Sequence, residues 1–115
     1  MNNLLRETIS ILHDNGKSWC DVIGVIVPEG RISKYDFLCL SNVNYDDSNY
    51  NAPVINPDLY IVGNGFWLER KASHTTGKEF WKFNKVPDII NLPFITIDTL
   101  KDKLCEDSLY NIKPI

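Results

Sequence analysis

The dipeptide Asn64-Gly65 is the feature that most restricts the fold, because it lies between two short runs rich in apolar and aromatic residues, 58–62 and 66–72. Asn-Gly is the strongest short signal for a two-residue β-hairpin loop, and a type I′ turn needs positive φ at both positions. We therefore predict an antiparallel hairpin with three pairs, namely Gly63 with Phe66, Ile61 with Leu68 and Leu59 with Arg70.

A second turn over 73–77 and a third strand over 78–85 extend this hairpin to a meander that spans about 58–85. With Thr75 and Thr76 as the loop, we predict that Arg70 pairs with Phe83 and Ala72 with Trp81. Side chains alternate between the two faces of a strand. One face is then apolar and holds Leu59, Ile61, Phe66, Leu68, Trp81 and Phe83. The opposite face is mixed and holds Tyr60, Val62, Trp67, Glu69, Lys71, Phe80 and Lys82.

The other segments add helices and a further strand to the meander. Apolar spacing predicts a helix over 3–15, a β-branched run predicts a strand over 21–27, and Ser33 precedes a short helix over 34–40. Residues 42–57 read as a long loop, 92–97 as an edge strand, 99–105 as a helix that Asp98 caps, and 106–115 as a flexible tail. The prediction is a single α+β domain over 1–115, with a small antiparallel sheet and two or three short helices.

Charge is segregated along the chain although the net charge is only −3. From Tyr35 to Glu69 there is no Lys or Arg, whereas Arg70 to Lys85 holds five basic residues against the single acidic Glu79. One interpretation is a partner-binding surface whose electrostatic potential has one sign, and the other is chance segregation of charges on a solvated surface. The acidic balance disfavours general nucleic-acid binding, which depends on Lys and Arg.

Cysteine and histidine are few and widely spaced: Cys20, Cys39, Cys105, His13 and His74. An odd cysteine number without close pairs argues against a disulfide framework and for a reducing compartment, so a cytoplasmic location is expected. Cys39 lies in an apolar run and is interpreted as a core residue. No CxxC or HxxxH pair is present, so no cofactor is predicted, and a metal site built from scattered ligands is the weakest alternative. No apolar run has the length of a membrane span.

Catalytic motifs are missing from the sequence, which has no GxSxG, P-loop or dinucleotide-binding fingerprint, and we predict that the protein is not an enzyme. The hairpin over 66–85 interleaves basic and aromatic residues, as proteins that bind single-stranded nucleic acid do. A nucleic-acid-binding module is therefore the alternative to protein binding. Its candidate residues are Trp67, Arg70, Lys71, Lys78, Phe80, Trp81 and Lys82.

Four motifs carry a resemblance: Tyr45-Asp46-Asp47, the run from Pro57 to Gly63, Trp67-Leu68-Glu69-Arg70 and the run from Glu79 to Phe83. Together they resemble small proteins carried by bacteriophages and mobile elements of low-GC Gram-positive bacteria. The resemblance implies an inhibitor of the anti-CRISPR type that acts in the host cytoplasm on a host protein such as an RNA-guided nuclease. Two further features support this expectation: the segment 35–69, which has no Lys or Arg and is here called the acidic segment, and the aromatic residues of the mixed face. The partner-binding residues expected on this basis are Tyr45, Asp46, Asp47, Tyr50, Tyr60, Trp67 and Glu69.

Overall fold

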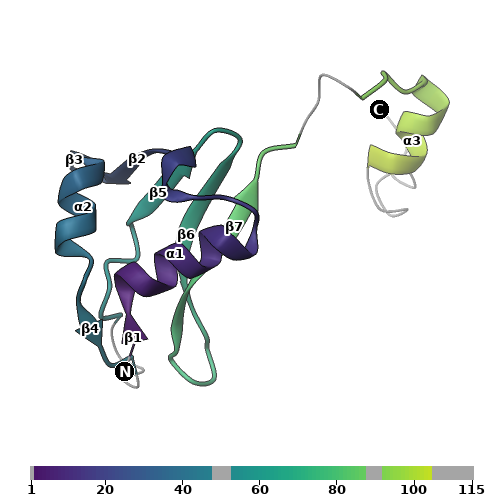
Figure 1. Cartoon of the computed structure of the whole chain (residues 1–115). Helices are drawn as coiled ribbons and strands as arrows, with labels where there is room; N and C mark the ends of the chain where they lie inside the picture. Colours follow the sequence, from purple (N-terminus) through teal and green to yellow (C-terminus); the bar gives the residue numbers. More distant parts are fainter. Residues whose placement is uncertain (1, 48–52, 88–91, 105–115) are drawn as a thin grey trace.

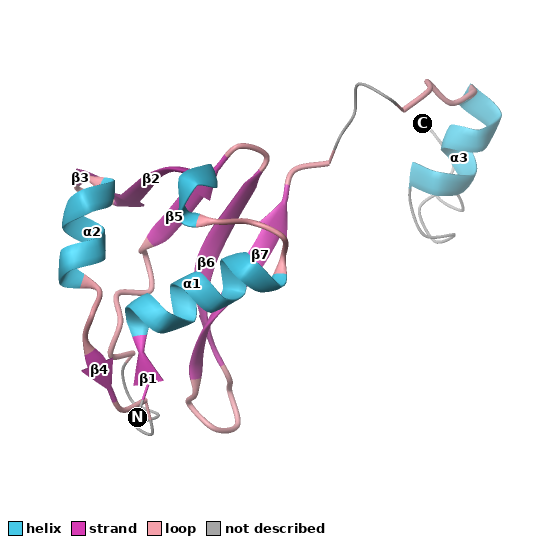
Figure 2. Ribbon diagram, in the orientation of Figure 1, coloured by secondary structure: helices cyan, strands magenta, loops and turns pink. Residues whose placement is uncertain are grey.

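The computed structural model describes residues 2–47, 53–87 and 92–104, and it confirms the α+β class (Figures 1 and 2). Two antiparallel sheets form within these residues, one with strand order β3-β2-β5-β6-β7 and one that pairs β1 with β4. The strands are β1 (Asn2–Asn3), β2 (Val22–Val27), β3 (Gly30–Ile32), β4 (Asn44–Tyr45), β5 (Tyr60–Gly63), β6 (Phe66–Ala72) and β7 (Glu79–Lys85). The α-helices are α1 (Leu4–Asp14), α2 (Lys34–Leu40) and α3 (Ile97–Leu104).

The β5–β6 hairpin has the predicted register, because Gly63 pairs with Phe66 and Ile61 with Leu68. The predicted type I′ turn is wrong. Gly65 has φ +83°, whereas Asn64 does not have a positive φ. A positive φ at the second turn position alone is the combination found in type II turns, which need glycine there and accept most residues before it.

The β6–β7 hairpin has a register two residues from the predicted one, since Arg70 pairs with Trp81 and Ala72 with Glu79. The turn itself is centred on Thr75 and Thr76, as predicted, and the backbone N–H of Ser73 donates to the carbonyl of Lys78 at 2.8 Å. A loop at these two residues aligns Arg70 with Trp81, so the predicted pairs did not follow from the predicted loop. A shift of two residues leaves each side chain on the same face. The face assignments therefore hold although these pairs were wrong.

Helices α1 and α2 cover the same face of the large sheet, and the core lies between them and the strands (Figure 2). Asn3 and Ser33 cap α1 and α2, and their side-chain oxygens accept from the backbone N–H of Arg6 and Asp36, both at 3.0 Å. The core combines the predicted apolar face of the meander, of which Phe83 is only partly buried, with buried residues from α1, α2, β2 and β4. Its buried members are Leu4, Leu12, Val22, Val25, Phe37, Tyr45, Leu59, Ile61, Phe66, Leu68 and Trp81.

Three segments depart from the prediction. The expected loop 42–57 contains β4, which pairs with β1, and β3 was not anticipated. Residues 92–96 form no strand, and α3 begins at Ile97, where the Thr96 hydroxyl accepts from the backbone N–H of Thr99 at 3.3 Å. The predicted tail 106–115 lies outside the described residues. In the part of the chain that the structure describes, no helix has the length and apolar character to cross a membrane.

Candidate functional site

The face of the large sheet away from α1 and α2, here called the outer face, is the first candidate surface. Both helices pack on the opposite face, so no described helix covers it (Figure 1). Alternation along the paired strands places a mixed set of side chains there: Ile26, Arg31, Tyr60, Val62, Trp67, Glu69, Lys71, Phe80, Lys82 and Asn84. The predicted mixed face of the meander is therefore the solvent side of the sheet.

Trp67 lies on the outer face in the row of residues next to the β5–β6 turn. It pairs with Val62 of β5 on one side and with Asn84 of β7 on the other. The neighbouring row of cross-strand pairs contains Tyr60 and Glu69. Trp67, Tyr60 and Val62 are each half-buried, so their apolar surface is only partly covered by neighbouring side chains. Aromatic side chains next to charged groups are common at protein interfaces.

Glu69 is held in place on the outer face by two neighbours. Asn84 Nδ2 donates to its Oε1 at 3.1 Å, and Lys71 Nζ lies 3.8 Å from its Oε2. The Lys71 side chain remains half exposed. The carboxylate is therefore oriented beside Trp67, and the outer face combines one acidic group with the basic side chains of Arg31, Lys71 and Lys82.

The Tyr-Asp motif occupies a different place, in a buried polar network under α1. The ring of Tyr45 is buried; its hydroxyl donates to Glu7 Oε1 and accepts from Arg70 Nη2, the latter at 3.1 Å. Burial raises the pKa of Tyr45 to about 12, and the hydrogen bond to the Glu7 carboxylate acts in the same direction. This phenol is therefore neutral, and it bridges a carboxylate and a guanidinium.

Arg70 and Glu79 complete this network on the core face. Glu79 accepts from the backbone N–H of Val54 at 2.7 Å and of Ile55 at 3.0 Å, and its own N–H donates to Asp47 Oδ2 at 2.7 Å. The acidic segment is thus bound to the start of β7 through the carboxylate of Asp47 and the backbone N–H groups of Val54 and Ile55. The network was not predicted, although the pairing of Arg70 with an apolar-face residue was the signal that could have shown its burial.

The seven predicted partner-binding residues therefore fall into separate groups. Tyr60, Trp67 and Glu69 lie together on the outer face, whereas Tyr45 and Asp47 take part in the network beneath α1. Asp46 is exposed and lines a small cavity with Asn2, Tyr45 and Asp47. Tyr50 lies outside the described residues. Of the nucleic-acid candidates, Arg70 and Trp81 are buried, and Lys71, Lys78, Phe80 and Lys82 are exposed.

The candidate metal ligands remain scattered. No group of three or more His, Cys, Asp or Glu side chains that could hold an ion occurs among the described residues. Cys20 and Cys39 are both exposed free thiols. The core assignment of Cys39 was wrong, because α2 presents Phe37 to the core and the side chain two positions later points away from it. Cys105 lies outside the described residues.

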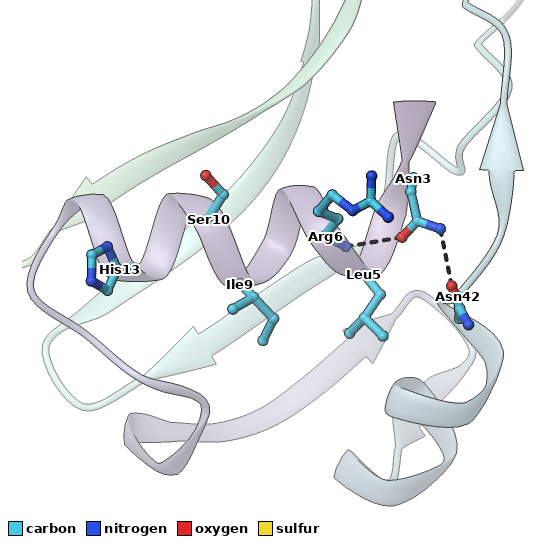
Figure 3. Close-up of a pocket in the computed structure, with 7 residues that line it drawn as sticks. All are labelled: Asn3, Leu5, Arg6, Ile9, Ser10, His13 and Asn42. Atoms are coloured by element: carbon cyan, nitrogen blue, oxygen red, sulfur yellow. Dashed lines mark hydrogen bonds between the residues drawn. The ribbon is translucent and has the colours of Figure 1, made fainter. Parts of the chain in front are cut away.

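A groove runs along the exposed flank of α1 that faces the segment after α2 (Figure 3). Leu5 and Ile9 form its apolar part, Arg6 and His13 its basic part, and Asn3 donates to Asn42 Oδ1 at 3.0 Å at one end. His13, a candidate ligand, thus lies beside apolar side chains and a basic group, a setting that does not attract a metal cation.

A second groove, here called the α1–β7 groove, lies on the other flank of α1 against β7. Ile11, Phe80 and Trp81 supply its apolar lining, and Glu7 and Asp14 supply carboxylates. No protein-family model, curated protein or solved structure matches this chain, so the function is argued from these surfaces.

Proposed function

We propose that this chain is a non-catalytic binding protein and that a partner protein docks on the outer face of its sheet. The observation that carries the proposal is the position of Trp67, half-buried beside Val62 and Tyr60 on a face that neither α1 nor α2 covers. Tryptophan and tyrosine are the side chains that most often dominate binding energy at the centre of protein interfaces.

The resemblance to phage-borne proteins directs the proposal to a host protein. In its specific form, the chain inhibits a host defence nuclease of the RNA-guided type in the host cytoplasm. The acidic segment then contributes long-range attraction to a basic partner, because surface charge steers association more than it adds contact energy. Asp46 is the exposed carboxylate of that segment among the predicted residues.

The test compares the affinities of the wild-type chain and its Trp67→Ala variant for a purified RNA-guided nuclease. Trp67→Ala is expected to weaken binding by about 30-fold, which corresponds to about 2 kcal/mol at an interface centre. Glu29→Lys, on the exposed β2–β3 turn, is the control and should change affinity little. Urea unfolding of each variant separates lost binding from lost stability. Unchanged affinity of a folded Trp67→Ala variant would contradict the assignment of the outer face.

A second function is favoured by one specific observation. The outer face that holds Trp67 carries three basic side chains, Arg31, Lys71 and Lys82, and among its described residues one acidic side chain, Glu69. Aromatic rings flanked by basic groups are the arrangement that binds single-stranded nucleic acid. Under this alternative, labelled single-stranded DNA or RNA binds at low salt, Lys71→Glu and Lys82→Glu each abolish binding, and affinity falls as salt rises. Tight binding of that kind would replace the protein-docking proposal.

A further inference from the structure

The described C-terminal segment, residues 92–104 and here called the arm, exposes an unusual amount of apolar surface. Its side chains are exposed throughout, and six of them are large and apolar: Leu92, Phe94, Ile95, Ile97, Leu100 and Leu104. Monomeric proteins rarely leave a contiguous apolar surface of this kind uncovered. Exposed apolar residues of this kind are typical of a segment that packs against another surface.

Within the arm, α3 is amphipathic. Ile97, Leu100 and Leu104 follow the i, i+3, i+7 spacing of one helix face and are 72%, 40% and 63% exposed. At 100° per residue, Lys101 and Lys103 flank this apolar stripe on its two sides. Asp98 and Asp102 lie toward the opposite face. The surface that α3 fits is consequently apolar in the middle and acidic along its edges.

The α1–β7 groove has this composition. Its apolar lining comes from Ile11, Phe80 and Trp81, and α1 contributes the carboxylates of Glu7 and Asp14. Phe80 belongs to the outer face and borders the groove at the edge of β7, where it is 45% exposed, whereas Trp81 is buried. β7 is the last strand of the described sheet, so the groove is also open on its outer side.

The other two apolar surfaces carry the wrong charge for α3. The groove on the opposite flank of α1 places Arg6, and no acidic residue among its lining, beside Leu5 and Ile9 (Figure 3). The outer face is rimmed by basic residues, as described above. Like charges in contact across an interface disfavour docking, so the lysines of α3 favour the α1–β7 groove. Arg6 also lines one part of that groove, but the carboxylates of Glu7 and Asp14 there outnumber its single positive charge.

The arm extends away from the body of its own chain (Figure 1). The radius of gyration is 19.3 Å, whereas a compact domain of this length has about 13 Å. We propose that α3 of a second copy docks in the α1–β7 groove, so that two copies exchange their arms. Each copy offers both an arm and a groove, so reciprocal exchange closes a twofold dimer with no site left open.

Analytical ultracentrifugation across micromolar concentrations is the first test. The full chain is expected to sediment as a dimer of about twice 13.2 kDa. Leu100→Asp, an exposed position that does not affect the body of the fold, is expected to give a monomer. A monomeric wild type, or a dimer that Leu100→Asp leaves intact, would overturn the proposal.

A charge swap identifies the groove. Asp14→Lys and Lys101→Glu should each raise the dimer dissociation constant about tenfold, and the double variant should restore it. Asp14 is the last residue of α1, where a cation is favourable to the helix, so the first variant should fold normally. Glu29→Lys makes the same change in net charge away from the groove and should leave the constant unchanged. If the double variant does not regain the wild-type dissociation constant, docking of α3 at Asp14 is contradicted.

Disulfide trapping distinguishes exchange from folding back onto the same chain. In a background with Cys20, Cys39 and Cys105 replaced by serine, one chain carries Ser10→Cys and the other Lys101→Cys. Oxidation of the mixture should give a cross-linked species of dimer mass. A single chain that carries both cysteines and closes only at monomer mass, at every concentration, would overturn the exchange.

Discussion

Arg70 and Glu79 form an ion pair on the core face of the sheet, with 3.7 Å between Nη2 and Oε1 and with side chains only 2% and 4% exposed. The guanidinium also lies 4.8 Å from the centre of the Trp81 ring. Among the described residues, its Nε and Nη1 atoms have no hydrogen-bond partner. The pair links β6 and β7 to Tyr45 and to the segment around Val54.

Removing one charge of the Arg70–Glu79 pair should lower the free energy of unfolding. Arg70→Met or Glu79→Gln leaves one buried charged group without its counter-ion, which typically destabilises a fold by about 3–5 kcal/mol. Urea unfolding should show that the double variant loses less than the sum of the two single losses, because neither charge is then stranded. Additive losses would indicate that the two groups do not interact.

Thr8→Val should destabilise the fold by about 1–3 kcal/mol, the cost of leaving a buried donor unpaired. The Thr8 hydroxyl accepts from Trp81 Nε1 at 2.9 Å and donates to the carbonyl of Leu4 at 2.7 Å. Valine has a similar shape but cannot accept. Ser10→Ala, an exposed position on the same helix, is the control in chemical denaturation and should have a small effect. Equal losses in the two variants would exclude the bond to Trp81 as the cause.

Replacing Gly63 or Gly65 of the β5–β6 hairpin should destabilise the fold by different amounts and for different reasons. A Cβ at Gly63 would lie 2.1 Å from atoms of the Phe66 ring, whereas at Gly65 it meets nothing within 4 Å and the constraint is φ +83°. Gly65→Asn should therefore cost about 1 kcal/mol or less, because asparagine tolerates positive φ. Gly63→Asn should be much worse, since the ring stacks on Phe83 and must move. Thermal unfolding checks the ranking, and equal losses would contradict it.

Alkaline pH should weaken the fold through Tyr45. Its pKa is about 12 in the folded chain and about 10 when unfolded, so the folded state holds the proton more tightly. The stability that this provides is fully present below pH 10 and is lost as pH rises through 12, a loss of roughly 2–3 kcal/mol. Unfolding free energies measured over this range should show a smaller slope in Tyr45→Phe. Tyr60→Phe is the matched control, and an identical slope in all three proteins would contradict the buried position of Tyr45.

Cys39 should react with a thiol reagent in the native protein. It is exposed on α2, as is Cys20 beside β2, so both thiols should be labelled without unfolding. Cys39→Ser should lower the number of thiols that label rapidly by one and leave the unfolding free energy nearly unchanged. Protection of Cys39 in the native state would support the core position expected from the apolar run around it.

Sequence periodicity predicted the faces of the meander more reliably than its details. Leu68 and Trp81 were placed in the core by alternation alone, and a register error of two residues did not disturb this, because alternation has a period of two. The turn type at Asn64 was missed because Asn-Gly favours a type I′ turn only statistically, and a type II turn also accepts this dipeptide.

The candidate site was predicted only in part, and the missed contacts join distant segments. Tyr45 reaches Glu7 across 38 positions and Arg70 across 25, and Asp47 meets the backbone of Glu79 across 32. A local pattern cannot reveal that a tyrosine and an aspartate in an acidic, loop-like segment are anchored by a buried arginine network. The predicted core position of Cys39 was wrong for a similar reason, since an apolar run in a helix also has residues on the exposed side, and only packing decides which side is exposed.

The sequence by itself determined the elements whose residues act locally: the capped helices α1 and α2, the strand β2 and the three-strand meander with its apolar and mixed faces. Backbone propensities and side-chain alternation are properties of neighbouring residues, and neighbours are visible in a sequence. The tertiary structure alone decided which face α1 and α2 cover, and therefore that Trp67 lies at the surface while Arg70 and Glu79 are buried. Burial depends on which segments meet in space, and only chain packing sets that.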